Sequence, residues 1–140
     1  MEMNPKVALV SYAVALPVFF AIDMVWLGWL SVDFYKTHIG HLLGPVNWGA
    51  AVAFYLLFIA GIVIFSVRPG LKTGSTKSAA FFGALYGLFT YATYDLTNMA
   101  TLPNWPLIVV VVDICWGAFL CASVGAITSL IVHRILKASA

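Results

Sequence analysis

Three aspartates are the residues in this chain whose chemistry most needs an explanation. Asp23, Asp95 and Asp113 each interrupt a long apolar stretch. An ionisable side chain inside such a stretch normally faces a protein interior, where it marks a site or a pathway. Carboxyl groups crowded in a medium of low dielectric constant cannot all stay ionised. We therefore expect that at neutral pH at least one aspartate is protonated, or that a cation is bound among the three.

The segment from Tyr91 to Asn98 surrounds one of these acids with hydroxyl, amide and aromatic groups. At helical spacing Tyr91, Asp95 and Asn98 share one face, and the amide and hydroxyl groups nearby can donate hydrogen bonds to a carboxylate. Asp23 and Asp113 are each followed three residues later by a tryptophan, which can wall a pocket or donate through its indole nitrogen. We interpret this shared D-x-x-W spacing as coincidence, because the two helices would run in opposite directions. The predicted binding residues are Asp23, Trp26, Tyr91, Tyr94, Asp95, Thr97, Asn98, Asp113 and Trp116.

Four apolar stretches are long enough to carry these residues across a membrane. A hydrocarbon core of ~30 Å needs about 20 helical residues. Such stretches run from Val7 to Leu30, Trp48 to Val67, Ser78 to Ala100 and Pro106 to Val132. The 140 residues are 63% hydrophobic and only 9% charged, whereas an average soluble domain is roughly 25% charged. The sequence therefore predicts an all-α, polytopic integral membrane protein, in which residues 1–140 form a single domain of four transmembrane helices.

Basic residues predict how these helices are oriented. All Lys and Arg residues except Lys36 fall on the side that holds both ends of the chain. The positive-inside rule then places both termini in the cytoplasm. The residues on that side are Lys6, Arg68, Lys72, Lys77, Arg134 and Lys137.

Three connectors join the four stretches. Residues 31–47 mix apolar and polar side chains and are predicted to form a short helix that lies on the outer membrane interface. Residues 68–77 contain proline and glycine and are predicted to form a plain polar loop in the cytoplasm. The connector from Pro103 to Pro106 is short, so helices three and four should be antiparallel neighbours.

Small residues at fourfold spacing predict that helices three and four pack closely and bring two acids together. Asp95 ends a ridge that contains Gly83 and Gly87, and Asp113 begins a ridge that contains Gly117. Both acids are equally far from the predicted turn, so they should lie at matching depth. The acid of the first stretch should lie at the same depth, ~10 Å below the outer surface at 1.5 Å per residue. We expect all three carboxyl groups to share one chamber.

Several kinds of chemistry are excluded. The chain has no Cys-x-x-Cys, no Gly-rich phosphate loop and no H-E-x-x-H motif. A formal net charge of +2 is too small to indicate binding of nucleic acid. His38 and His41 lie on the predicted interfacial helix and could complete a metal site with the three acids, but histidines at a membrane surface are usually solvated. We predict no metal site and assign no cofactor.

Four segments of the chain resemble a known family. They read FFAIDMVWLG, FYKTHIGHLL, YATYDLTN and VDICWG, and they are similar to the bacterial predicted membrane proteins grouped as domain of unknown function 2177. The resemblance spans nearly the whole chain and implies a small four-helix protein of the bacterial inner membrane, with no activity to carry over. The positions that match its motifs are Asp23, Trp26, Gly28, Tyr94, Asp95, Thr97, Asn98, Asp113, Trp116 and Gly117.

Three functions stay open at this point. The first is a small carrier or binding protein whose outward-facing acidic pocket takes a proton, a cation or a small polar molecule, with Asp95 and Asp113 as the titrating pair and Asp23 and Asn98 beside them. The second is a membrane-embedded enzyme that acts on a lipid-like substrate through carboxylate acid–base chemistry. The third is an accessory subunit of a larger membrane complex, with its small-residue ridges facing another chain. The expected partners are the lipid bilayer and a small molecule or cation, and a homodimer that enlarges the pocket stays open.

Overall fold

The computed structural model describes residues 1–138, and its regular structure is entirely helical, with no β-strand within these residues. Two of the long helices continue into π-helical segments, and the first connector forms a short helix that ends in a 3₁₀ turn. The elements are α1 (Pro5–Val25) with the π-helical segment Trp26–Leu30, α2 (Val32–Ile39) with the 3₁₀ turn Gly40–Leu42, α3 (Trp48–Ile62) with the π-helical segment Val63–Val67, α4 (Arg68–Thr73), α5 (Thr76–Thr101) and α6 (Leu107–Ala138).

Three helical segments of the described chain are long and apolar enough to cross a membrane. They are Pro5–Leu30, Trp48–Thr73 and Leu107–Ala138. The prediction of an all-α fold is confirmed within the described residues, with three of the predicted membrane-crossing helices meeting the criteria of length and composition. α5 has 26 residues, the same length as the first two segments, but it is less apolar. The crossing predicted for α5 therefore stays a prediction.

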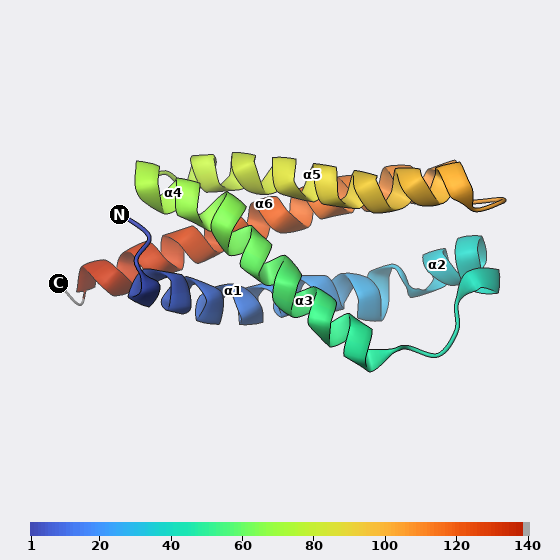
Figure 1. Ribbon diagram of the computed structural model, residues 1–140, viewed down its shortest axis with the longest axis horizontal. Coiled ribbons are helices and arrows are strands. Elements are labelled where there is room, and N and C mark those ends of the chain that lie inside the picture. Colours follow the sequence, from blue (N-terminus) through green and yellow to red (C-terminus); the bar gives the residue numbers. More distant parts are fainter. Residues whose placement is uncertain (139–140) are drawn as a thin grey trace.

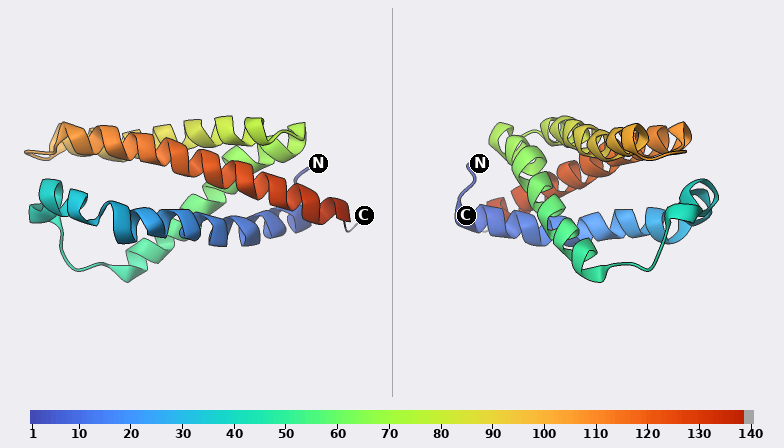
Figure 2. Two further views of the ribbon diagram at one scale, coloured as in Figure 1. Left: turned by 180° about the vertical axis from the view of Figure 1, so that it is seen from behind. Right: turned by 45° about the vertical axis from the view of Figure 1, so that its right-hand side comes forward.

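α1, α5 and α6 run along the long axis of the molecule, and α3 crosses them obliquely (Figures 1 and 2). α5 and α6 are antiparallel neighbours joined by a short turn, which confirms that prediction. Asn104 in this turn has φ 61°, a left-handed conformation that asparagine tolerates better than most residues. Both chain termini lie at one end of the molecule, and α2 and the α5–α6 turn lie at the other (Figure 1).

The predicted small-residue ridges of α5 and α6 do face each other. A methyl group added at Gly87 would lie 1.9 Å from the carbonyl oxygen of Gly117, and one added at Gly83 would lie 2.3 Å from the carbonyl oxygen of Cys121. The two helices therefore touch backbone to backbone, which only glycine allows at these positions. Close packing of this kind holds helices together in lipid, where no hydrophobic effect acts between them.

The loop predicted for residues 68–77 is wrong, because helix continues through Pro69 and Gly70 and ends only at Thr73. The preceding π-helical turn explains this result. The N–H of Arg68 bonds the carbonyl of Val63, five residues before it, and this wider turn leaves room for a proline that lacks an N–H. Gly74, with φ 65°, then ends the helix in the left-handed conformation typical of such caps.

A short helix does form in the first connector, as α2. Its position on a membrane interface stays a prediction. Ser31 precedes the helix, and its hydroxyl donates a hydrogen bond of 2.7 Å to the carbonyl of Trp26. This bond fixes the direction in which the chain leaves the π-helical segment and turns back over the end of the bundle.

Replacing Gly87 by alanine should lower the melting temperature of the detergent-solubilised protein, because the added methyl group forces α5 away from α6. Overpacking of this kind costs roughly 1–3 kcal/mol. Gly28→Ala is the matched control, because no described neighbouring group lies within 4 Å of the methyl group it adds. Circular-dichroism melts compare the variants, and a Gly87→Ala protein as stable as wild type would contradict the backbone contact.

Candidate functional site

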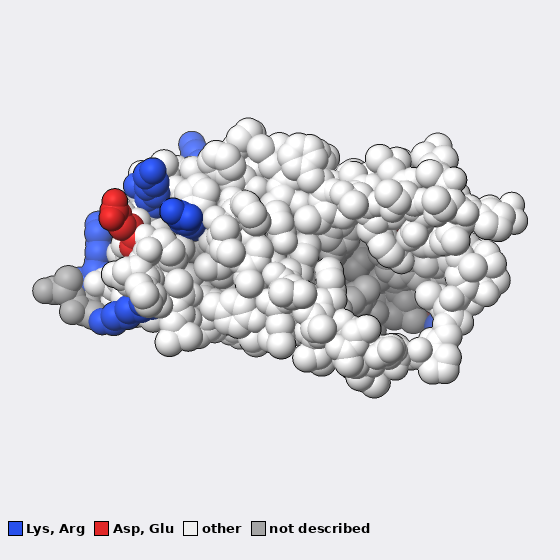
Figure 3. All heavy atoms as spheres, in the orientation of Figure 1, with Lys and Arg blue, Asp and Glu red and all other residues white. Residues whose placement is uncertain are grey.

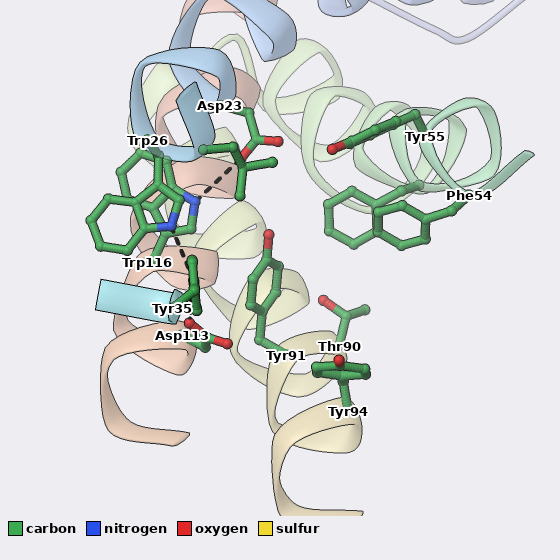
Figure 4. A pocket seen from close by; sticks show the side chains of 12 residues that line it. Asp23, Trp26, Tyr35, Phe54, Tyr55, Thr90, Tyr91, Tyr94, Asp113 and Trp116 are labelled. Carbon is green, nitrogen blue, oxygen red and sulfur yellow. Dashed lines mark hydrogen bonds between the residues drawn. The ribbon is translucent and has the colours of Figure 1, made fainter. Parts of the chain in front are cut away.

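A cavity of about 460 Å³ opens among the long helices, in the half of the molecule away from the chain termini. Figure 3 shows it as a hollow on the long side of the molecule. All four long helices and α2 contribute to its wall, as the close view in Figure 4 shows. The lining residues are Asp23, Trp26, Leu27, Tyr35, Phe54, Tyr55, Phe58, Thr90, Tyr91, Tyr94, Asp113 and Trp116.

The wall of this cavity is aromatic and acidic. Eight of its twelve residues are Phe, Tyr or Trp, two are aspartates, and none is Lys, Arg or His. The negative faces of aromatic rings and carboxylate groups both attract a positively charged ligand. The rings also offer apolar surface against which an uncharged part of such a ligand can pack.

Asp23 reaches the cavity from α1, where it continues a buried row with Ser11, Ala15 and Phe19 at fourfold spacing. Its side chain is only 3% exposed. The indole Nε1 of Trp116 donates a hydrogen bond of 3.3 Å to Asp23 Oδ1. In Figure 4 the hydroxyl of Tyr55 points toward Asp23 from across the cavity.

Asp113 reaches the cavity from α6 and is 7% exposed. Tyr35 of α2 donates a hydrogen bond of 2.5 Å to Asp113 Oδ1, and Trp26 Nε1 donates one of 3.1 Å to the Tyr35 hydroxyl. Burial and the bond to Asp113 raise the pKa of Tyr35 well above its ordinary value. The phenol therefore keeps its proton and acts as a donor to the carboxylate.

The tryptophan of each D-x-x-W motif interacts with the aspartate of the other motif, directly or through Tyr35, across α1 and α6. Trp116 follows Asp113 in sequence but bonds Asp23, and Trp26 follows Asp23 but supports Asp113 through Tyr35. The two indoles stack with ring centroids 4.5 Å apart and planes 10° apart. Each tryptophan therefore supports the aspartate of the other motif, Trp116 directly and Trp26 through Tyr35.

Asp95 does not line the cavity, which corrects the expectation of one chamber for all three acids. It is fully buried, at 0% exposure, beside Asp113 and the indole of Trp105. Neither of its oxygens makes a hydrogen bond to any described residue. Asp95 lies on the same face of α5 as Gly87, so its side chain enters the contact between α5 and α6 instead of the cavity.

Of the other predicted binding residues of α5, two line the cavity and two do not. Tyr91 and Tyr94 line the cavity, and the Tyr91 hydroxyl points into it (Figure 4). Thr97 is exposed, and its hydroxyl donates to the carbonyls of Thr93 and Tyr94 in its own helix. Asn98 is half-buried outside the cavity. The expected amide and threonine donors are thus replaced by tyrosine and tryptophan.

The metal site considered for the histidines is not formed. His38 Nδ1 lies 2.8 Å from the carbonyl oxygen of Phe34, and His41 is exposed. Within residues 1–138, no three His, Cys, Asp or Glu side chains come together in a group that could hold a metal ion. The structure therefore does not bring His38 and His41 to the three aspartates.

Six of the lining residues are absent from the binding residues predicted from the sequence. They are Leu27, Tyr35, Phe54, Tyr55, Phe58 and Thr90. The one available signal for Tyr35 was that it falls in FYKTHIGHLL, one of the four segments that resemble the family. Spacing could not find it, because α2 folds back over the bundle before Tyr35 reaches Asp113.

Tyr35→Phe should destabilise the protein by roughly 1.5–3 kcal/mol, the range for hydrogen bonds to charged groups. The change removes the donor to Asp113 and the acceptor for Trp26 while it keeps the ring. Tyr12→Phe is the control, because it removes an exposed hydroxyl that bonds the Leu56 carbonyl at 3.1 Å. Unfolding in detergent, followed by tryptophan fluorescence, measures both. Equal destabilisation by the two substitutions would show that the Tyr35 hydrogen bonds stabilise the protein no more than the exposed Tyr12 hydrogen bond does.

Comparison with known proteins agrees with this picture of an apolar helical protein. The model of one family, described as "Predicted membrane protein (DUF2177)", matches residues 8–130. No curated protein and no solved structure matches the chain. Because the match covers most of the sequence and includes both D-x-x-W motifs, this protein belongs to that family of predicted membrane proteins.

Proposed function

We propose that this protein is a small membrane carrier or binding protein whose cavity takes an organic cation with an apolar body. The observation that carries the proposal is the make-up of the wall, which combines eight aromatic rings with the carboxylates of Asp23 and Asp113 and contains no basic side chain. Aromatic faces and carboxylates together are the usual way in which proteins hold quaternary ammonium and similar cations. The volume of about 460 Å³ is in the range of small-molecule sites.

An organic cation fits this wall better than a bare metal ion or a neutral molecule. Burying a carboxylate without a counter-charge costs several kcal/mol of desolvation free energy. A positively charged ligand offsets this cost, whereas a neutral ligand does not. A bare cation needs several oxygen ligands, whereas this wall offers mainly carbon. The rings of Phe54, Phe58 and Tyr91 would instead surround an apolar body.

Asp95 would link binding to protonation. Its carboxyl group lies beside that of Asp113, and two neighbouring carboxyl groups in a medium of low dielectric constant hold one proton between them. A cation bound at Asp113 favours the ionised form of that residue. The shared proton then resides on Asp95 or leaves, so occupancy and protonation are coupled.

We further propose that α5 is a fourth crossing and that both termini are cytoplasmic. α5 is long enough, packs along α6 and exposes Phe81, Phe89 and Leu96 as a lipid-facing surface would. Figure 3 shows basic side chains gathered at the end that holds the termini, the side that the positive-inside rule assigns to the cytoplasm. The cavity would then face outward, and the membrane would be the bacterial inner membrane.

Cysteine labelling on intact cells tests this orientation. In a Cys115→Ser, Cys121→Ser background, Leu102→Cys in the α5–α6 turn should react with a membrane-impermeant maleimide. Thr73→Cys at the end of α4 should react only after the membrane is opened. Labelling of position 73 from outside, or labelling of position 102 only after the membrane is opened, would contradict the proposed orientation.

Binding of tetraphenylphosphonium to the purified protein tests the function. Asp113→Asn and Asp23→Asn should each weaken binding at least about tenfold, since tenfold is only 1.4 kcal/mol and buried charge pairs often exceed it. Asp33→Asn is the matched control, because it removes an exposed acid of α2 outside the cavity. Isothermal titration calorimetry gives the affinities, and circular dichroism confirms that each variant is folded.

A neutral probe of similar shape, triphenylphosphine oxide, completes the experiment. Wild type should bind the cation much more tightly than the neutral compound. Equal affinity for both would overturn the cation proposal and favour a second candidate, a membrane-embedded enzyme that acts on a lipid-like substrate through Asp23 and Asp113. The position of the opening on the long side of the molecule supports that candidate, because a lipid tail could enter there (Figure 3). Mass spectrometry of lipids incubated with wild type and Asp113→Asn would then test for a product.

The accessory-subunit alternative loses its main support. It expects the small-residue ridges to face another chain, whereas Gly83 and Gly87 face α6 of the same chain. It also expects paired acids without a cavity, whereas two of the acids line one.

A further inference from the structure

A second cavity, of about 310 Å³, lies where the end of α4, the start of α5 and the end of α6 meet. Figure 1 shows these three parts at the end of the molecule that holds both chain termini. We propose that this cavity binds a phosphate group, carried either by a lipid head group or by a free phosphate compound. Its lining residues are Gly70, Gly74, Ser75, Thr76, Lys77, Ser129, Leu130 and His133.

The first N–H groups of α5 are donors at this cavity. Ser75 is the N-cap, and its hydroxyl accepts a hydrogen bond of 3.3 Å from the N–H of Ser78. The N–H groups of Thr76 and Lys77 come earlier in the helix and have no carbonyl of the preceding turn to bond. The start of a 26-residue helix also carries a partial positive charge. This is the arrangement that binds phosphate at helix N-termini in other proteins.

A side chain of α6 supplies an independent reason to expect a ligand. Ser129 is only 3% exposed and lines the cavity, and its hydroxyl makes no hydrogen bond to a described residue. Buried polar groups are nearly always hydrogen-bonded, so a group that enters the cavity and accepts a hydrogen bond would satisfy this hydroxyl.

The position of Ser129 is fixed by the helix that continues through Gly70. A methyl group at Gly70 would lie 2.8 Å from Ser129 Oγ and 2.5 Å from Ala79 Cβ. α4 therefore approaches α5 and α6 so closely that only glycine fits. The close approach brings Gly74 and the cap of α5 next to Ser129 and forms the cavity.

The chemistry of this wall selects a phosphate anion. Amide N–H groups, the Lys77 ammonium group, a serine hydroxyl and a histidine nitrogen can all donate, and no Asp or Glu is among the lining residues. Phosphate offers several oxygens to such a set, and charge-assisted hydrogen bonds of this type are about twice as strong as neutral ones. The phosphate site is independent of what the larger cavity binds.

Native mass spectrometry with a matched pair of lipids tests the site. Dioleoyl phosphatidic acid and dioleoylglycerol differ only by the phosphate group, and wild type should retain the first in clear preference to the second. Lys77→Gln and Ser129→Ala should each lower this retention about tenfold, the effect of one charge-assisted hydrogen bond. Lys72→Gln is the control, because it removes an exposed charge at the same end of the molecule outside the cavity. Melting temperatures establish that the variants are folded.

A parallel titration with inorganic phosphate, followed by ³¹P NMR, distinguishes the two sources. Retention of phosphatidic acid alone assigns a lipid head group, binding of inorganic phosphate alone assigns a soluble phosphate compound, and either result supports the site if Lys77→Gln and Ser129→Ala reduce it. Equal retention of the two lipids together with no phosphate binding would overturn the proposal. So would an unchanged affinity in both variants.

Discussion

The contact between the backbones of α5 and α6 determines where the acids of this protein can lie. Gly87 rests on the carbonyl of Gly117, so no side chain fits between the helices at that level. Asp95 lies about two helical turns further along the same face of α5. Its side chain is therefore enclosed beside Asp113 and has no route to open space. The cavity must form on the other side, where α5 faces α1 and α3 through its tyrosines. In a membrane such close packing replaces the hydrophobic effect as the force between helices.

The two acids that do reach the cavity are each supported by a different helix. Trp116 of α6 bonds Asp23 of α1, while Tyr35 of α2, backed by Trp26, bonds Asp113 of α6. Hydrogen bonds donated to a carboxyl group favour its ionised form. Asp95 has no such donors among the described residues. The acids that receive these hydrogen bonds are therefore Asp23 and Asp113, the two that line the cavity.

Local patterns in the sequence were enough to predict the helices, the glycine ridges and the antiparallel pairing of α5 with α6. They failed where an outcome depended on a distant part of the chain. Tyr35 belongs to the site only because α2 folds back over the bundle, and Pro69 stays in a helix only because a π-helical turn precedes it. The depth of Asp95 was predicted from spacing, but its direction depends on which face of α5 the glycines turn toward α6.

Both cavities lie next to a π-helical segment, and one physical reason connects the two cases. A π-helical turn inserts an extra residue, so every side chain after it is rotated relative to a continuing α-helix. After Asp23 the segment Trp26–Leu30 places Trp26 and Leu27 in the wall of the larger cavity. The segment Val63–Val67 lets the chain pass Pro69 and bring Gly70 against α5 and α6, which closes the smaller cavity. Each departure from regular helix thus positions residues that a regular helix would have turned away.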